Sequence, residues 1–513
     1  MDIAALVSLS GYFILMLGIG FYAYRQSTSD SAGYLLGGRN LSPAVGALSA
    51  GASDMSGWIL LGLPGAVFVA GLSEAWIAVG LVIGAFFNYL LVAPRLRTYT
   101  ELAEDAITIP DFFEKRFDDK SRSLRIISSI VIIIFFTVYT SSGVAAGGKL
   151  FEASFGLNYT LGLFLTASVV VAYTLIGGFL AVSLTDFVQG CIMFLALVLV
   201  PIVAIDVLGG FGETGAILSQ ENPALLQLMN AASEDGTARG VGFVALLSLM
   251  AWGLGYFGQP HIIVRFMALR SAKDAVVARH IGMSWMIVTV LGAVGVGLAG
   301  RAFFLSSEQR IAEYLGDQAG VAAFDPETIF IVLSQILFHP LIAGFLLAAI
   351  LAAIMSTISS QLLVSSSSLT EDFYKVFLRK EASERELVRV GRLSVLAVAL
   401  VAVGLALDRS SNILTLVSNA WFGFGSAFGP LVLFSLFWRR MTRNGALAGM
   451  VLGAGTVLVW IYGPAGGHQS VAAIIPGFGL ASIGILLGSL ASRPLPMELL
   501  ERHDRVSGAV AGA

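Results

Sequence analysis

The sequence predicts an all-α membrane protein with about 13 transmembrane helices, and its composition, apolar runs and basic residues all support this fold class. The 513 residues have a mean hydropathy of +0.85; 57% are hydrophobic and only 12% are charged. A soluble protein of this length could not keep so much apolar surface out of water. The polar stretches between the apolar runs are loop-sized. We therefore expect a single transmembrane domain over residues 1–513.

An apolar run of roughly 20 residues is long enough to cross a bilayer as a helix. Such runs lie near 3–24, 43–70, 73–93, 123–150, 158–179, 184–207, 240–266, 277–304, 341–370, 388–407, 412–437, 444–463 and 471–492. If the N-terminus lies outside, 25 of the 30 Lys and Arg residues fall in cytoplasmic loops, Arg265 among them. Because cytoplasmic loops are enriched in Lys and Arg, this distribution predicts an outside N-terminus and a cytoplasmic C-terminus.

Two of the expected spans contain features that interrupt helices. Residues 46–63 (GALSAGASDMSGWILLGL) include Asp54 with several Gly and Ser residues, and residues 250–262 (MAWGLGYFGQPHI) include three glycines and Pro260. Gly weakens a helix by roughly 1 kcal/mol, and a charge at mid-membrane costs at least about 2.5 kcal/mol. These spans are the first and sixth when the N-terminal helix is set aside. This arrangement predicts two inverted five-helix repeats, over about 43–207 and 240–437.

Broken helices have a chemical use in a membrane. They expose backbone carbonyls to cations and helix N-termini to carboxylates, and a transporter needs both. For one Gly-rich span alone, close helix packing would be the commoner explanation. Two broken spans at matching repeat positions, together with a buried aspartate, favour a binding site instead.

A third segment, residues 352–370 (AAIMSTISSQLLVSSSSLT), is rich in hydroxyl groups. Ser356, Ser359 and Ser360 have the spacing i, i+3, i+4 and so share one helix face, with Thr357 one step around. Clustered oxygen ligands without charge suit a hard monovalent cation that must be released easily. The segment therefore predicts a cation site.

Other classes of protein fit the sequence less well. The single cysteine, Cys191, excludes a disulfide framework, and the five histidines lack the spacing of a zinc site. Asp54 and Asp186 have no obvious acid–base partner, which argues against an enzyme; Asp186 fits a favourable charge at a helix start as well as a cation ligand. A channel would need a recognisable filter sequence, and a sensor would need a long signalling tail. The sequence shows neither.

Several strings closely resemble members of the solute:sodium symporter family. They are ALSAGASDMSGW (47–58), GLPGAVFVAGLSEAW (62–76), WGLGYFGQPHI (252–262), ILAAIMSTIS (350–359), SSSLTEDFYK (366–375) and RMTRNGALAGM (440–450). The resemblance implies the leucine-transporter type fold: ten core helices in two inverted repeats, one extra helix before them and two after. It also implies a secondary active transporter that couples inward sodium movement to solute uptake, with no obligate protein partner and no nucleic acid.

The resemblance also assigns site residues. For sodium it implies the backbone carbonyls of Ala52, Met55 and Ala353 and the hydroxyls of Ser356 and Thr357, with Asp54 as an essential neighbour. For the substrate it implies Ser56, Gly57, Trp58, Tyr139, Trp252, Tyr256 and Pro260. Some members have a second cation site, which Asp186, Ser359 and Ser360 would match, although the proline-transporting branch couples one sodium ion per substrate.

The resemblance is closest to that branch, which implies L-proline as substrate and the bacterial inner membrane as location. Proline is a zwitterion with an apolar ring, so a net-neutral pocket with aromatic walls and a helix N-terminus for the carboxylate suits it. Other branches transport pantothenate, small carboxylates or sugars, and these stay as alternatives. A sugar carrier would need more polar side chains near the breaks than Gln259 alone.

Overall fold

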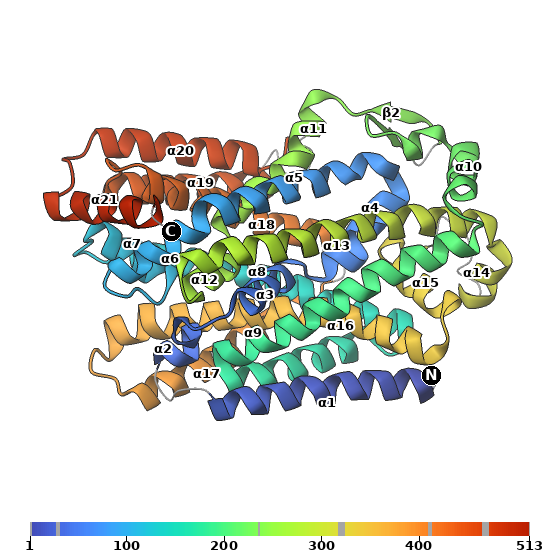
Figure 1. The fold of residues 1–513 in the computed structure, drawn as a ribbon, viewed down its shortest axis with the longest axis horizontal. Helices are drawn as coiled ribbons and strands as arrows, with labels where there is room; N and C mark the ends of the chain where they lie inside the picture. The colour runs from blue at the N-terminus through green and yellow to red at the C-terminus, as the bar shows by residue number, and fades with distance from the viewer. Residues whose placement is uncertain are drawn as a thin grey trace.

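The computed structural model describes residues 3–26, 31–233, 236–315, 324–408, 413–463 and 471–511. Long helices lie side by side along the longest axis of the molecule (Figure 1). The first half contains α1 (Ile3–Gln26), α2 (Ser31–Leu36), α3 (Pro43–Asp54), α4 (Leu63–Ala70), α5 (Ala75–Phe87), α6 (Ala93–Leu102), α7 (Ile109–Phe117), α8 (Ser123–Phe155), α9 (Tyr159–Val207), α10 (Phe211–Glu221) and α11 (Phe243–Met250). The second half contains α12 (Pro260–Ala268), α13 (Ala272–Ser306), α14 (Glu308–Leu315), α15 (Ile329–Leu337), α16 (Pro340–Ser367), α17 (Glu384–Ala406), α18 (Ile413–Phe437), α19 (Arg443–Tyr462), α20 (Ile474–Leu490) and α21 (Met497–Ala511).

Short 3-10 and π-helical segments connect or extend these helices. They are η1 (Gly37–Arg39), η2 (Trp58–Gly62), η3 (Gly71–Glu74), η4 (Asn88–Val92), η5 (Pro223–Leu226), η6 (Ala251–Gly258), η9 (Pro326–Thr328) and η10 (Ser368–Leu378). In the described residues, the strands β1 (Asn230–Ala232) and β2 (Ala238–Gly240) pair antiparallel as a small hairpin.

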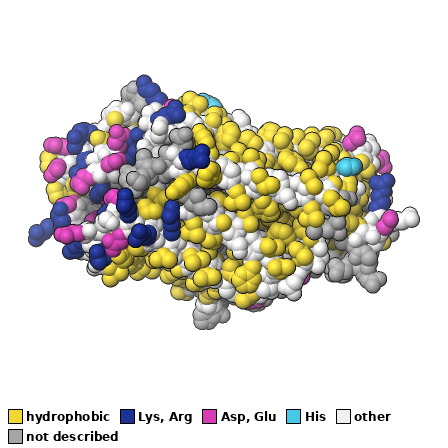
Figure 2. All heavy atoms as spheres, turned by 90° about the horizontal axis from the view of Figure 1, so that it is seen from below, with side chains coloured by type: hydrophobic (Ala, Val, Ile, Leu, Met, Phe, Trp, Pro, Cys, Tyr) yellow, Lys and Arg dark blue, Asp and Glu magenta, His cyan; other side chains and the backbone are white. Residues whose placement is uncertain are grey.

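Charged side chains gather toward the two ends of the molecule, and Lys and Arg gather mainly at one of them (Figure 2). This basic end carries α6, α7 and α21, whereas α10, α14 and the N-terminus lie at the opposite end (Figure 1). Between the ends the visible face is mostly hydrophobic (Figure 2). Among the described residues, 9 helices are long and apolar enough to cross a membrane. Such a surface suits the hydrocarbon core of a bilayer.

Each expected span contains a helix, and one pair of spans is joined without a loop. Residues 159–207 form the 49-residue helix α9, which changes direction at Gly178 (φ 60°, ψ −154°). A Cβ atom at Gly178 would lie 2.6 Å from the ring of Tyr34. Only glycine adopts this backbone conformation easily, so Gly178 does here what a loop was expected to do.

Both predicted helix breaks are confirmed. Helix α3 ends at Asp54, Met55 leaves the helical region (φ −80°, ψ 78°), and the chain resumes as η2 and α4. In the second segment η6 ends at Gly258, Gln259 is extended (φ −84°, ψ 106°), and α12 begins at Pro260. Proline suits the first helical position because no N–H is needed there.

Some glycines of the second segment serve close packing. A Cβ atom at Gly84 on α5 would lie 2.1 Å from the carbonyl oxygen of Gly253, and one at Gly80 would lie 2.3 Å from that of Met250. The backbones of α5 and η6 are therefore in direct contact, as small residues permit. Gly255 and Gly258 are packed as closely against α18, so the glycines of this segment serve close packing up to the break itself.

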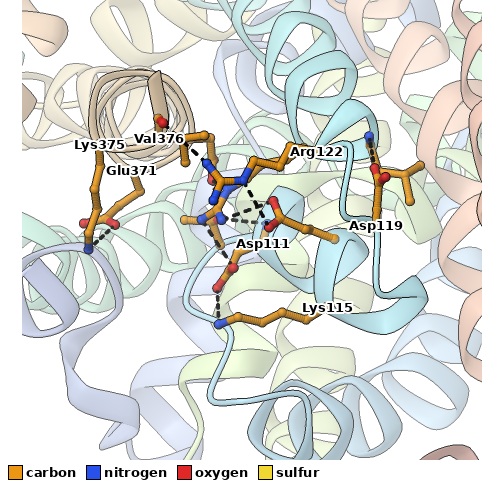
Figure 3. A network of polar contacts seen from close by, with 12 residues as sticks. Asp111, Lys115, Asp119, Arg122, Glu371, Lys375 and Val376 are labelled. Carbon is orange, nitrogen blue, oxygen red and sulfur yellow. Dashed lines mark hydrogen bonds and ion pairs between the residues drawn. The ribbon is translucent and has the colours of Figure 1, made fainter. Parts of the chain in front are cut away.

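At the basic end, an ion-pair network joins α7, α8 and η10 (Figure 3). Arg125 on α8 contacts Asp372 on η10 (Nε to Oδ1, 2.6 Å) and, on α7, Asp111 (Nη2 to Oδ1, 3.3 Å) and Glu114 (Nη1 to Oε2, 3.3 Å). Thr108 accepts the N–H of Asp111 and donates to Asp372 (3.2 Å). The side chains of Asp372 and Asp111 are 0% and 5% exposed, so these contacts are shielded from salt.

We expect Gly178→Ala to lower the free energy of unfolding by at least about 1–3 kcal/mol, because alanine is strained at this φ and its Cβ meets Tyr34. Gly455→Ala on α19 is the matched control, since nothing lies within 4 Å of its Cβ position. The measurement is the thermal unfolding midpoint of both purified variants in detergent. Equal midpoints would show that the turn at Gly178 tolerates a side chain.

Candidate functional site

Asp54 lies at the broken end of α3 and is 2% exposed. The Tyr256 hydroxyl on η6 donates to its Oδ2 atom, while Oδ1 has no hydrogen-bond partner in the described part of the chain. The indole N–H of Trp58 donates to the Asp54 backbone carbonyl (3.1 Å). Asp54 therefore connects the two helix breaks directly.

Four of the five predicted sodium ligands lie together in what we name the oxygen cluster: the Ala52 and Ala353 carbonyls and the Ser356 and Thr357 hydroxyls. The Ser356 hydroxyl donates to the Ala52 carbonyl (2.7 Å) and is 3.1 Å from that of Ala353. The Thr357 hydroxyl donates to the Ala353 carbonyl (3.3 Å). All four residues are at most 1% exposed. The cluster therefore bridges α3 and α16 with oxygen atoms alone.

Met55, the fifth predicted ligand, follows in the break itself. Its N–H donates to the Gly51 carbonyl (2.9 Å), and it is fully buried. Its sulfur accepts from the Thr289 hydroxyl on α13 (3.5 Å). The non-helical φ and ψ of Met55 leave its carbonyl outside the regular helical ladder, where it is free of an i+4 partner.

The predicted substrate residues come from four elements around the breaks. Ser56 and Gly57 follow the end of α3, Tyr139 is on α8, Trp252 and Tyr256 are on η6, and Trp58 and Pro260 begin η2 and α12. All of them are buried. The structure brings Tyr256 to Asp54 and Tyr139 beside Ser56, whereas Trp252 packs against Phe422 on α18 (ring centroids 5.0 Å apart).

Several buried polar atoms near these residues have no well-oriented hydrogen-bond partner among the described residues. They belong to Ser56 (Oγ), Tyr139 (Oη), Gln259 (Oε1) and both ring nitrogens of His261. The His261 and Tyr139 rings are 5.9 Å apart and perpendicular. Buried polar groups are nearly always paired; here Tyr139 lies beside Ser56 and His261 lies beside the backbone of Ser53, without good hydrogen-bond geometry.

His261 and Trp421 also lie at this site, although neither was predicted there from the sequence. The Trp421 indole on α18 donates to the Trp252 carbonyl (2.8 Å), and its own carbonyl accepts from the Gln259 amide (3.0 Å). His261 sits in the quoted motif, so its position beside Pro260 was an available signal. Trp421 is about 160 residues from its partners and carried no local signal.

The possible second cation site contains an arginine. The guanidinium of Arg265 contacts Asp186 (Nη2 to Oδ2, 3.2 Å) and donates to the Ser360 hydroxyl, and both charged side chains are 0% exposed. The prediction that Arg265 lies in a cytoplasmic loop is therefore wrong: it is buried in α12, because Asp186 compensates its charge. Ser359 points elsewhere and donates to the Ser356 carbonyl (3.1 Å).

Two helices broken within their spans beside an uncharged oxygen cluster define the class of secondary transporters with the leucine-transporter type fold. Two solved structures share this fold. A Na⁺-coupled sialic acid symporter has a TM-score of 0.79 and 18% identity, covering 96% of this chain and 99% of its own. The nucleobase-cation-symport-1 family transporter Mhp1 has a TM-score of 0.55 and 12% identity, covering 92% and 98%.

The chain belongs to the sodium:solute symporter family, whose sequence model matches residues 34–453. It is 58% identical over 495 residues to the osmoregulated proline transporter OpuE of Bacillus subtilis, covering 96% of both chains. It is 54% identical over 458 residues to a sodium/proline symporter of Staphylococcus aureus, covering 89% of this chain and 85% of the relative. As a member of this family the chain is a multi-pass membrane transporter and not an enzyme.

We expect Tyr256→Phe to lower the free energy of unfolding by about 1–3 kcal/mol, because it leaves the buried Asp54 carboxylate without its donor. The double variant Asp54→Asn/Tyr256→Phe should lose less than the sum of the single variants, since the two groups interact. Tyr22→Phe on the exposed face of α1 is the control. Strictly additive losses in thermal unfolding would contradict a coupling between these side chains.

Proposed function

We propose that this chain couples inward sodium movement to the uptake of L-proline by alternating access. The two relatives with identities of 54–58% carry proline in their names, which supports the substrate. The observation that carries the proposal is the hydrogen bond from Ser356 on α16 to the Ala52 carbonyl on α3 (2.7 Å). It sets a hydroxyl against the broken end of a helix, so an ion bound there would hold the break in one shape.

The proposed sodium site uses the oxygen cluster with the Met55 carbonyl. Sodium is a hard cation that prefers oxygen ligands, and rotation of the two hydroxyl hydrogens would turn their oxygens toward it. The five ligands carry no net charge, and Asp54 follows two residues after Ala52 on the same helix. A neutral ligand set binds a monovalent ion weakly enough for release, which a coupled cycle requires.

The proposed proline site is lined by the aromatic side chains of Tyr139, Trp252 and Tyr256. These rings suit the apolar pyrrolidine, and the N-terminus of α12 at Pro260 favours the carboxylate through the helix dipole. A Cβ atom at Gly57 would lie 3.1 Å from that of Ala146, so a larger residue there would disturb α8. The unpartnered groups described above supply hydrogen bonds for a zwitterion.

We propose that the basic end faces the cytoplasm across a bacterial inner membrane, because positively charged loops stay inside. This orientation puts the N-terminus outside and the C-terminal helix α21 inside (Figure 1). The repeats at about 43–207 and 240–437 would then contribute one broken helix each. Their relative movement would open the site to one side of the membrane at a time.

The test of the proposal is uptake of radiolabelled proline into proteoliposomes. An inward sodium gradient should drive accumulation, and replacing sodium by potassium should abolish it. Pantothenate, acetate and galactose serve as competitors for the alternative substrates. Proline uptake that is independent of sodium would contradict the coupling. Competition by one of these solutes that is as strong as that by unlabelled proline would contradict proline as the substrate.

We expect the double variant Ser356→Ala/Thr357→Ala to raise the sodium midpoint of proline binding at least about tenfold, because a lost buried ligand costs about 1–3 kcal/mol. Proline affinity should fall as well and recover at high sodium, since binding linkage is reciprocal. Thr357→Ser, which keeps the hydroxyl, should change little. Ser365→Ala is the matched control on the same helix, being fully buried but outside the oxygen cluster. An unshifted sodium midpoint in the double variant would show that the ion binds at another place.

A further inference from the structure

Arg265 is a fully buried arginine at the centre of four helices. Every nitrogen of its guanidinium faces an oxygen atom. Nε contacts the Ser49 hydroxyl on α3 (3.1 Å), and Nη1 contacts the His261 carbonyl on α12 (2.6 Å). Nη2 contacts the Asp186 carboxylate on α9 (3.2 Å) and the Ser360 hydroxyl on α16. The guanidinium thus occupies a space whose polar lining consists of oxygen alone.

This arginine cage lies one turn from the oxygen cluster on the same two helices. Ser49 precedes Ala52 by three residues on α3, and Ser360 follows Ser356 by four on α16. Residues with these spacings share a helix face and lie about 5–6 Å apart along it. The contact between α3 and α16 therefore carries two oxygen-lined positions in a row. One contains no charged side chain, and the other contains a carboxylate and a fixed cation.

At the second position the negative charge is already compensated by a side chain of the protein. The Asp186 carboxylate accepts from the Ser49 hydroxyl (2.7 Å) as well as from Arg265, and both charges are withdrawn from water. Removing one member of such a pair leaves an uncompensated buried charge, which is strongly unfavourable. In this chain the compensating positive charge belongs to the Arg265 side chain, so it cannot dissociate as an ion could.

We propose that the Arg265 guanidinium permanently holds the place of a second sodium ion, so that this chain binds one sodium ion where an arginine-free relative of the same geometry would bind two. The inference rests on the proposed sodium-coupled function. Its chemical basis is the donor set: two hydroxyls, one carbonyl and one carboxylate are hard oxygen ligands with a single negative charge, which suits a monovalent cation.

Arg265→Met tests this directly. Methionine keeps an unbranched apolar stem, puts its methyl group where Nε lies, and has no counterpart of Cζ and the two terminal nitrogens, so it frees the space beside Asp186 and Ser360. We expect binding of ²²Na⁺ to the purified protein to rise from about one ion per chain to about two. Sodium should also raise the thermal midpoint of this variant far more than that of the wild type, relative to choline, because an ion that binds only the folded state stabilises it.

Two further variants separate a cation site from packing. Asp186→Asn/Arg265→Met removes both charges, so its sodium count should return to about one and its extra sodium stabilisation should vanish. Arg97→Met is the matched control: Arg97 is also buried, but it bonds the Leu269 and Arg270 carbonyls and Glu101, away from the cage. This control should bind no additional sodium.

The outcomes distinguish the inference from the proposed function. A sodium count that stays at one in Arg265→Met, or a second ion that persists without Asp186, would overturn the inference alone. Failure of Arg265→Met to fold even in high sodium would also overturn it, since a replaceable cation should be restored by the ion. If the wild type bound no sodium at all, the proposed sodium-coupled function itself would be contradicted.

Discussion

A helix that is interrupted inside a membrane leaves carbonyl groups without their N–H partners, and hydrocarbon offers no replacement. The structure meets this constraint with side chains from other parts of the chain. The Trp58 indole donates to the Asp54 carbonyl (3.1 Å), and the Trp421 indole donates to that of Trp252 (2.8 Å). The Ser356 hydroxyl plays the same part on α3. Aromatic and hydroxyl groups therefore converge on the breaks because the breaks require donors.

The features that depend on local sequence could be predicted. Apolar length located helices in each expected span, of which 9 helices in the described residues are long and apolar enough to cross a membrane, and the Gly-rich segments with Asp54 and Pro260 located both breaks. Helical spacing put Ser356 and Ser360 on one helix face, and in the structure Ser356 donates to Ala52 on α3. The same spacing was less informative for Ser359, because a helical serine can also bond to a carbonyl of its own preceding turn, as Ser359 does.

The features that depend on distant partners could not be predicted. A charged residue near the end of an apolar run is usually a loop residue, and Arg265 fits that rule until Asp186 and Ser49 are brought to it from other helices. Gly178 follows Gly177 at the end of the expected span 158–179, but the sequence does not tell that the turn is made by one positive φ inside a continuous helix. In both cases the missing information is tertiary: a buried charge needs a known partner, and a turn needs a known neighbour.

Helix α16 continues without interruption into η10, so residues Pro340–Leu378 form one 39-residue rod. At 1.5 Å per residue the 28 residues of α16 alone are about 42 Å long, which exceeds the roughly 30 Å thickness of bilayer hydrocarbon. The ion pair between Asp372 and Arg125 ties the basic end of this element to α8, so this end cannot move independently of α8. Most of this helix is buried among the other helices, so its position is set by protein contacts. Ser356 in the oxygen cluster and Asp372 in the ion-pair network therefore belong to one continuous helical element, and a shift of either end is passed along it to the other.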